Sequence, residues 1–256
     1  MNKKVSIITV VYNNNKFIRK AIDSVLKQDY PSIEYIIIDG GSTDGTIDII
    51  NEYKDQIALF ISEPDNGIYD GINKGISHAS GSIIGLLHSD DFYPNPHVIS
   101  DVMESFTQLP EIEVVLGNVD FVDPEDLANP IRFYSSFKFE PWKMRFGFMP
   151  AHPASFIKKS VYEQVGLYKL GYEIAADFDM FLRMFMVNKL SFSKLNKTLV
   201  RMRIGGVSTS GWKSYITSTK EMQRSLDENR IYSNILMVLI RLPVKFVQKV
   251  KSKIGG

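Results

Sequence analysis

Short apolar runs rich in β-branched residues alternate with helical patterns along the first third of this chain. We expect strands at residues 4–11, 33–39, 57–62 and 82–87, and helices between them at residues 17–26, 44–50 and 68–79. Strands separated by helices are joined by crossover connections, which make the strands parallel and put helices on both faces of the sheet. The alternation therefore predicts an α/β fold with a mostly parallel central sheet.

Polar clusters follow the ends of these predicted strands. They are Asn13-Asn14, residues 39–45, residues 63–67 and residues 89–91. Ligands of open α/β sheets bind outside the carboxyl ends of the strands. We therefore expect one site built from these four loops, with Asn14 or Asn15 also capping the first helix.

Length and composition narrow the class of protein. A chain of 256 residues fits one large domain or one domain with an appendage, and its net charge of +1 argues against a nucleic-acid partner. Without cysteine, a bound metal has to sit on carboxylate, imidazole or water, which favours a hard cation. No apolar stretch approaches the roughly 18 residues of a transmembrane helix, so we expect a cytoplasmic protein.

Two adjacent carboxylates, Asp90 and Asp91, end the fourth predicted strand. Like charges side by side at the end of a buried strand require a positive neighbour. A divalent cation whose shell is completed by diphosphate oxygens meets that requirement. The alternative is a turn and helix cap, since two prolines follow within the next residues. On this pair alone both interpretations stay open.

The glycine-rich loop at residues 39–45 follows the second predicted strand. Its glycines permit tight turns near a ligand, and Asp39 can accept a hydrogen bond from the ring N–H of a base. The loop does not match the G-x-G-x-x-G dinucleotide pattern. Asp44 offers the alternative that the loop only caps the next helix.

The pattern changes after about residue 110. We expect a strand at residues 113–119, irregular edge strands at 121–139, helices at 158–165 and 179–187, and a strand at 190–202. A polar helix is expected at 218–229, and the segment from 231 onward is basic and amphipathic, with Arg241, Lys245, Lys249, Lys251 and Lys253 and no acidic residue. Such a helix can lie on an anionic membrane surface, or pack on the domain with a solvated basic face.

The chain resembles family 2 glycosyltransferases of the GT-A fold, and within them the bacterial O-antigen and capsule transferases. The resemblance spans about residues 5–208 and rests on motifs in the family's order: Ile7-Ile8-Thr9-Val10-Val11-Tyr12-Asn13, residues 39–46, Asp65-Asn66-Gly67-Ile68-Tyr69-Asp70, Asn73-Lys74-Gly75 and Ser89-Asp90-Asp91. It implies a catalytic domain at residues 1–210, with a nucleotide-sugar half at 1–119 and an acceptor half at 120–210. Residues 211–256 would form a helical, membrane-associating tail.

The resemblance also implies how the donor is bound. Asp39 would bind the uracil base, and the backbone near Thr9, Val11 and Tyr12 would hold the nucleotide. Asp65 and Lys74 belong to further matching donor motifs. Asp90 would contact the ribose or sugar, and Asp91 would bind Mn²⁺ or Mg²⁺. Because Ser89-Asp90-Asp91 lacks the first Asp of a strict D-x-D motif, we expect the metal to be held jointly with the UDP diphosphate.

In the second half, Asp177 matches the general base of the family, although Ala176 replaces the usual Glu. Asp179 is the alternative base or a helix cap. His152 lies in a stretch shared with the O-antigen branch and is expected either to bind the acceptor or its phosphate, or to be structural. Arg203 resembles a cation of the family's closing segment, with Gly205 and Gly206 as hinges.

The expected reaction is a single displacement with inversion at the anomeric carbon. A hexose or N-acetylhexosamine would move from a UDP-sugar to a polyprenyl-diphosphate-linked saccharide at the inner face of the cell membrane. The alternatives are a sugar nucleotidyltransferase and a non-catalytic, membrane-docked nucleotide-sugar-binding protein. The former lacks its Gly-rich loop followed by Arg and Pro-Lys here, and Asp177 argues against the latter.

Overall fold

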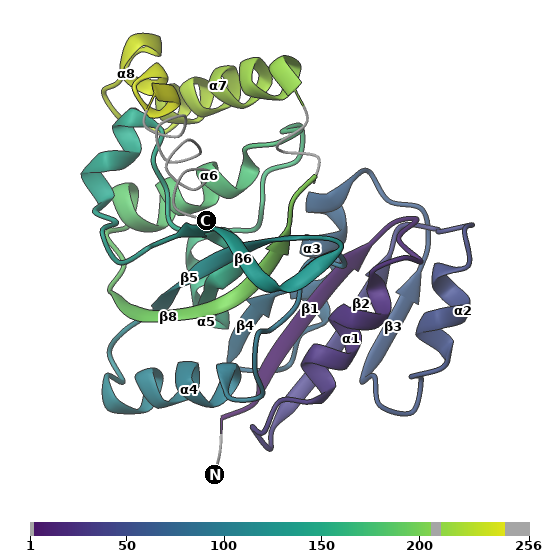
Figure 1. Cartoon of the computed structure of the whole chain (residues 1–256). Coiled ribbons are helices and arrows are strands. Elements are labelled where there is room, and N and C mark those ends of the chain that lie inside the picture. Colours follow the sequence, from purple (N-terminus) through teal and green to yellow (C-terminus); the bar gives the residue numbers. More distant parts are fainter. Residues whose placement is uncertain (1–2, 206–210, 244–256) are drawn as a thin grey trace.

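The computed structural model describes residues 3–205 and 211–243. Within them one sheet contains eight strands: β1 (Val5–Val11), β2 (Ile33–Asp39), β3 (Leu59–Ser62), β4 (Ile83–Leu86), β5 (Val114–Asp123), β6 (Asp126–Tyr134), β7 (Ser155–Lys158) and β8 (Phe192–Arg203). Their order is β3-β2-β1-β4-β7-β5-β6, and β8 pairs with β5 (Figure 1). The first four strands are parallel, as predicted.

Helices cover both faces of the parallel half, and β1 shows why the strands there are apolar along their whole length. Ile8 and Val10 belong to the same core cluster as α3 (Ile68–His78). Ile7 and Val11 point to the other face, into the cluster that holds α1 (Ile18–Leu26) and α4 (Val98–Gln108). The short helix α2 (Thr46–Asn51) contacts α1. Successive β1 side chains thus pack into two separate cores, one on each face of the sheet.

The second half extends the sheet with a reversal of direction. β7 is antiparallel to both β4 and β5, β6 forms an antiparallel edge on β5, and β8 runs parallel to β5. Two 3₁₀ turns, η1 (Pro141–Phe146) and η2 (His152–Ala154), and the helix α5 (Lys159–Val165) complete this region. The helices α6 (Ala176–Leu182), α7 (Gly211–Glu228) and α8 (Ile235–Leu239) lie together, away from α1 and α2 (Figure 1), and α6 shares a core cluster with β4 and β5.

Most predicted elements are present, and the differences have local causes. Neither α4 nor β7 was predicted. The strand β7 has only four residues, too few to show a period. The helix expected at 179–187 begins earlier, at Ala176, and becomes a π-helix, η3 (Arg183–Val187), whose end is held by Asn188 bonding to the carbonyl of Arg183. The predicted cap was wrong: α1 begins at Ile18 after Phe17, without a side-chain cap.

The start of the basic tail packs on the domain. Val238 of α8 is completely buried, and Arg241 is only 2% exposed, donating to the hydroxyls of Ser218 (3.0 Å) and Thr219 (2.9 Å) on α7. Arg241 is therefore not part of a solvated basic face, contrary to the prediction. Residues 244–256, which contain the four lysines of the tail, lie outside the described residues. No helix in the described ranges is long and apolar enough to cross a membrane.

Candidate active site

Two asparagines after β1 join the loops that follow three parallel strands. The backbone N–H of Asn13 donates to Ser42 Oγ (2.7 Å), and that of Asn14 donates to Thr46 Oγ1 (2.9 Å). The amide of Asn14 also donates to Ser89 Oγ (2.8 Å) beside the acidic pair. Asn13 has φ +46°, a left-handed conformation that Asn tolerates better than most residues. The strand ends expected to share a site are thus tied together.

Asp39 ends β2 and organises the loop after it. Its buried carboxylate accepts hydrogen bonds from the backbone of Gly41 (3.1 Å) and Ser42 (2.9 Å) and from the hydroxyls of Ser42 (2.5 Å) and Ser62 (2.7 Å). Three of these bonds go to Oδ2 and only one, from Ser42 Oγ, goes to Oδ1. Because each carboxylate oxygen has two lone pairs, Oδ1 keeps one acceptor site for the N–H of a base.

Asp65 and Lys74 lie around the same loop. Asp65 accepts from the backbone of Gly67 (2.9 Å), and its Oδ2 approaches Gly40 so closely that a Cβ there would lie 2.8 Å away. Lys74 Nζ is 2.8 Å from Glu63, whose carboxylate raises the pKa of the lysine. A phosphate that binds to Lys74 therefore has to compete with an existing ion pair.

The end of β1 offers different groups along its length. The Thr9 hydroxyl is buried and lies 3.0 Å from that of Tyr35, so only the backbone of Thr9 is available to a ligand. Val11 is buried as well, whereas Tyr12 is 65% exposed and stands at the mouth of the loops.

Asp91 has an unusual environment for an acidic residue. It is 1% exposed, and among the described residues neither carboxylate oxygen has a partner at ordinary hydrogen-bond distance. Burial and the neighbouring Asp90 raise its pKa well above the ordinary value of 3.8, and the charge and backbone N–H of Arg203 oppose this shift. Its backbone N–H bonds to the carbonyl of His88 (3.0 Å), so the segment is also a turn. Asp91 thus fits both interpretations of the acidic pair, a turn and a metal-binding carboxylate. A turn alone, however, does not explain why the carboxylate is buried without a partner.

Arg203 supplies the positive charge behind the acidic pair. It is 6% exposed, donates to the carbonyl of Asp90, and packs its guanidinium carbon 4.6 Å from the ring centroid of Phe17 and 5.1 Å from that of Phe92. Burial lowers its pKa, and the charges of Asp91 and Asp90 oppose that shift. Arg203 is thus fixed in place at the end of β8. Residues 206–208, the rest of the expected closing segment, lie outside the described residues.

A row of rings leads from the acidic pair toward α6. The ring centroids of His88 and His152 are 6.0 Å apart, and His152 Nε2 is 2.8 Å from the hydroxyl of Tyr168. Burial lowers the pKa of His152 to about 3, with a further contribution from His88. At neutral pH His152 is therefore an uncharged hydrogen-bonding group. The pKa of Tyr168 is raised mainly by burial, and Asp177 adds to the shift.

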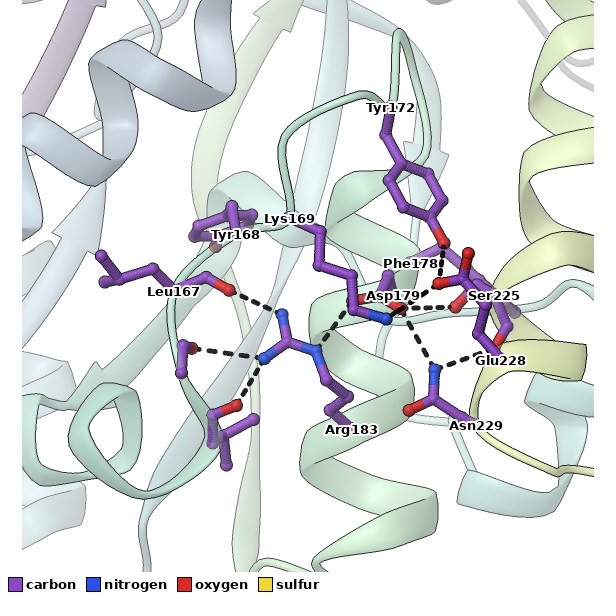
Figure 2. Close-up of polar contacts among 12 residues, drawn as sticks. Leu167, Tyr168, Lys169, Tyr172, Phe178, Asp179, Arg183, Ser225, Glu228 and Asn229 are labelled. Carbon is purple, nitrogen blue, oxygen red and sulfur yellow. Dashed lines mark hydrogen bonds and ion pairs between the residues drawn. The ribbon is translucent and has the colours of Figure 1, made fainter.

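Asp177 and Asp179 occupy the first turn of α6 but have different surroundings. Asp177 is half-buried, and its Oδ1 accepts from the backbone of Phe178 (2.7 Å). Asp179 is completely buried and faces α7, as Figure 2 shows. Its carboxylate pairs with Lys169 (3.1 Å) and Arg183 (2.8 Å) and accepts from two α7-side groups, Ser225 Oγ (2.9 Å) and Asn229 Nδ2 (3.1 Å).

Glu221 of α7 holds the chain just before Asp177. Its carboxylate accepts from three consecutive backbone N–H groups, those of Glu173 (2.6 Å), Ile174 (3.0 Å) and Ala175 (2.8 Å). Charge-assisted bonds of this kind are among the strong hydrogen bonds of proteins. Sequence reasoning missed Glu221, because it lies 46 residues beyond Ala175 and nothing local signals the contact.

The residues present fit a hard divalent cation that a substrate helps to hold. Among the described residues no group of three or more His, Asp or Glu side chains is placed to bind a metal by itself. Mg²⁺-type ions are nevertheless bound through one or two carboxylates together with substrate phosphates. The unpartnered oxygens of Asp91 provide such a carboxylate at the edge where the strand-end loops meet.

The fold is the GT-A fold of glycosyltransferases. An S. aureus TarS fragment in complex with UDP-GlcNAc superimposes with a TM-score of 0.69 at 19% identity, over 87% of this chain and 66% of that chain. Glucosyl-3-phosphoglycerate synthase from Mycobacterium tuberculosis, in complex with Mn²⁺, UDP and phosphoglyceric acid, gives 0.63 at 16% identity over 87% and 78%. The predicted fold class is thus confirmed.

Sequence comparison identifies the family. The glycosyl transferase family 2 model matches residues 6–166. An uncharacterized glycosyltransferase of Mycobacterium tuberculosis (strain ATCC 25618 / H37Rv) is 35% identical over 186 residues, 72% of this chain and 69% of that protein. This chain belongs to glycosyl transferase family 2.

Proposed function

We propose that this glycosyltransferase moves a hexose or N-acetylhexosamine, with inversion, from a UDP-sugar to a hydroxyl of a polyprenyl-diphosphate-linked saccharide in surface polysaccharide synthesis. The observation that carries the proposal is Asp91, a buried carboxylate without a partner where the strand-end loops meet. A folded protein retains such a group where a ligand completes its interactions.

The loops after β1, β2 and β3 bind the donor in this proposal. Asp39 accepts the ring N–H of uracil on Oδ1, which carries only the hydrogen bond from Ser42 Oγ. The backbone of residues 9–12 and the ring of Tyr12 line the nucleotide. Asp65, beside Gly40, and Lys74 contact the nucleotide sugar, and Asp90 binds the ribose or the transferred sugar.

Asp91 and the UDP diphosphate together hold Mn²⁺ or Mg²⁺. When bound, the cation stabilises the charge of the departing diphosphate, so that no separate general acid is needed. Arg203 stays behind Asp90 and Asp91 and limits their mutual repulsion in the absence of donor. The contacts of Arg203 with the rings of Phe17 and Phe92 hold it in this position and support this role.

Asp177 acts as the general base. Its carboxylate takes the proton of the acceptor hydroxyl, whose oxygen attacks the anomeric carbon on the face opposite the diphosphate. An α-linked donor then yields a β-linked product. Asp179 is unsuited to this step because two cations and two hydrogen-bond donors already occupy its carboxylate. His152, uncharged at neutral pH, orients the acceptor by hydrogen bonding.

UDP release with a synthetic diphosphate-lipid saccharide acceptor, screened over UDP-sugars, tests the proposal. Asp177→Asn should lower kcat by about 10²–10⁴-fold, the usual contribution of a general base, with little change in UDP-sugar affinity. Glu173→Gln, which removes an exposed carboxylate four positions earlier, should keep normal kcat. UDP-sugar binding without UDP release for any lipid-linked acceptor would support a binding protein instead and contradict transfer.

We also propose peripheral docking at the inner face of the membrane, through Lys245, Lys249, Lys251 and Lys253. The support is their charge and spacing in a stretch without acidic residues. Because Val238 and Arg241 pack on the domain, the test is deletion of residues 244–256 rather than of the whole tail. The deletion should reduce binding to anionic liposomes, and unchanged binding would contradict membrane docking.

A further inference from the structure

A large cleft opens beside the acceptor half, between β6, the η1 turn and α8. Its volume is about 1050 Å³, comparable to the largest small-molecule sites. None of the strand-end loops that surround Asp91 contributes to its lining. The cleft is therefore separate from the proposed donor site.

The walls of the cleft are mainly aromatic. Phe133, Phe137 and Trp142 line it and are each at least half exposed, at 55%, 50% and 57%. Exposed aromatic side chains grouped around one hollow are unusual on a soluble surface and mark a binding site for an apolar partner.

The charged groups in the lining are all cationic. Arg132, Lys138 and Lys143 line the cleft, and no acidic residue is among the described lining residues. The guanidinium carbon of Arg132 lies 3.5 Å from the ring centroid of Phe121, and its buried Nε has no hydrogen-bond partner in the described ranges. Burial lowers its pKa. A half-buried cation without a counter-ion favours an anionic ligand.

The cleft lies between α7 and an exposed apolar helix. Met222 of α7 lines it, and the adjacent Glu221 holds the backbone of residues 173–175, the segment just before Asp177. At the other side Ile240 lines the cleft next to α8, whose Leu236 is 72% exposed and whose Ile235 and Leu239 are also exposed. An apolar chain that enters along α8 thus has its polar end on the side of α7.

We propose that this cleft binds the lipid part of the acceptor as a single molecule: one apolar chain on the aromatic wall, with its phosphate or diphosphate on Arg132. The proposal rests on the lipid-linked acceptor of the proposed function. A single bound chain fits this site better than a membrane surface does, because the aromatic residues surround a hollow instead of forming a flat face.

Calorimetric binding of farnesyl diphosphate to the full chain tests this site. UDP and a chelator are present, so that the diphosphate does not bind at Asp91. Farnesyl diphosphate should bind at least about tenfold more tightly than either farnesol or inorganic pyrophosphate, since chain and anion each contribute. Equal affinity of farnesyl diphosphate and pyrophosphate would overturn the proposal.

Variants separate the two contributions. Arg132→Gln should weaken farnesyl diphosphate about tenfold and leave farnesol unchanged, because a charge-assisted contact is lost. Trp142→Ala should weaken both. Lys197→Gln is the matched control, since it removes a β8 cation that pairs with Asp101 of α4 (2.7 Å). Arg132→Lys, which keeps the charge, should keep most of the affinity. If Arg132→Gln does not fold, Trp142→Ala at an exposed position still tests the site. Unchanged farnesyl diphosphate affinity in Trp142→Ala, or in a folded Arg132→Gln, would contradict the site.

Two results distinguish this proposal from its rivals. Binding to phosphatidylglycerol vesicles without binding of monomeric farnesyl diphosphate would show a membrane surface and overturn the single-chain site. Turnover of a lipid-linked acceptor without any farnesyl diphosphate binding would also overturn it, while leaving the proposed transfer intact. Conversely, farnesyl diphosphate binding that persists in an inactive Asp177→Asn variant supports the cleft independently of catalysis.

Discussion

Two fully buried carboxylates, Asp91 in the first half of the chain and Asp179 in the second, have opposite environments. Asp179 has two cations and two neutral donors around it, all supplied by the protein (Figure 2). Asp91 has no hydrogen-bond partner within the part of the chain that the structure describes. Burying a charge is costly unless it is paired. Burial alone therefore does not distinguish the two carboxylates; the absence of partners is the reason for proposing Asp91, and not Asp179, as a metal ligand.

The largest effect on the free energy of unfolding is expected when Asp179, the paired carboxylate, is removed. Asp179→Ala leaves the buried Arg183 without its counter-ion, whereas Lys169 keeps its ion pair with Glu228 (3.0 Å). The free energy of unfolding should fall by about 3–5 kcal/mol in urea titrations. Asp48→Ala, at an exposed position of α2, should change it by less than about 0.5 kcal/mol. If both variants were equally stable, the network around Asp179 would not be a structural element.

Glu221→Gln should have the next largest effect. All three backbone N–H groups before Asp177 lose a charged acceptor, and at least one of them faces the amide NH₂ of Gln, which costs about 1.5–3 kcal/mol of stability. In the proposed mechanism Glu221 positions the base without contacting substrate, so kcat should fall while KM for the UDP-sugar is unchanged. Glu221→Asp should restore part of kcat. A rise in the donor KM would contradict this positioning role and weaken the contrast between the halves.

Asp91→Asn should increase the free energy of unfolding, in contrast to Asp179→Ala. It removes an unpaired buried charge, so the substrate-free protein should gain about 0.5–2 kcal/mol, the range typical of stabilising substitutions. Thermal unfolding without metal or nucleotide measures the change. A loss of stability as large as that of Asp179→Ala would mean that Asp91 has a structural partner after all.

The smallest expected effect is that the stability difference between the wild type and Asp91→Asn depends on pH. The raised pKa of Asp91 means that the folded state keeps a proton that the unfolded chain releases above about pH 4. Stability of the wild type should therefore fall relative to Asp91→Asn as pH rises from 4 through the folded pKa. Urea titrations of both proteins at several pH values test the sign. A wild type that gains stability over this range would show that Asp91 is stabilised as an anion.

Sequence reasoning was most successful where a local period determines structure. The alternating pattern predicted β1 to β4 and the convergence of their loops, because the carboxyl ends of parallel strands meet at one edge. It did not predict β7, whose place between β4 and β5 depends on pairing with strands far away in the chain. Arg241 was misassigned for the same reason: a basic residue in a basic segment is buried by partners on α7.

The two carboxylates illustrate this limit at the site itself. Both follow similar local patterns, an acidic residue next to or near another at the start of a turn or helix. Only the distant partners differ: Lys169, Ser225 and Asn229 surround Asp179, whereas the nearest cation to Asp91 bonds to the carbonyl of Asp90. The roles of donor, metal and base residues therefore stay predictions until they are tested in solution.

Calorimetric binding of UDP with and without Mn²⁺ tests the central claim most directly. In the wild type, Mn²⁺ should increase UDP affinity at least about tenfold, since carboxylate and diphosphate share the ion. Asp91→Asn should fold normally, bind UDP alone as before, and lose this increase. A variant that keeps the full Mn²⁺-dependent increase would show that Asp91 does not hold the metal.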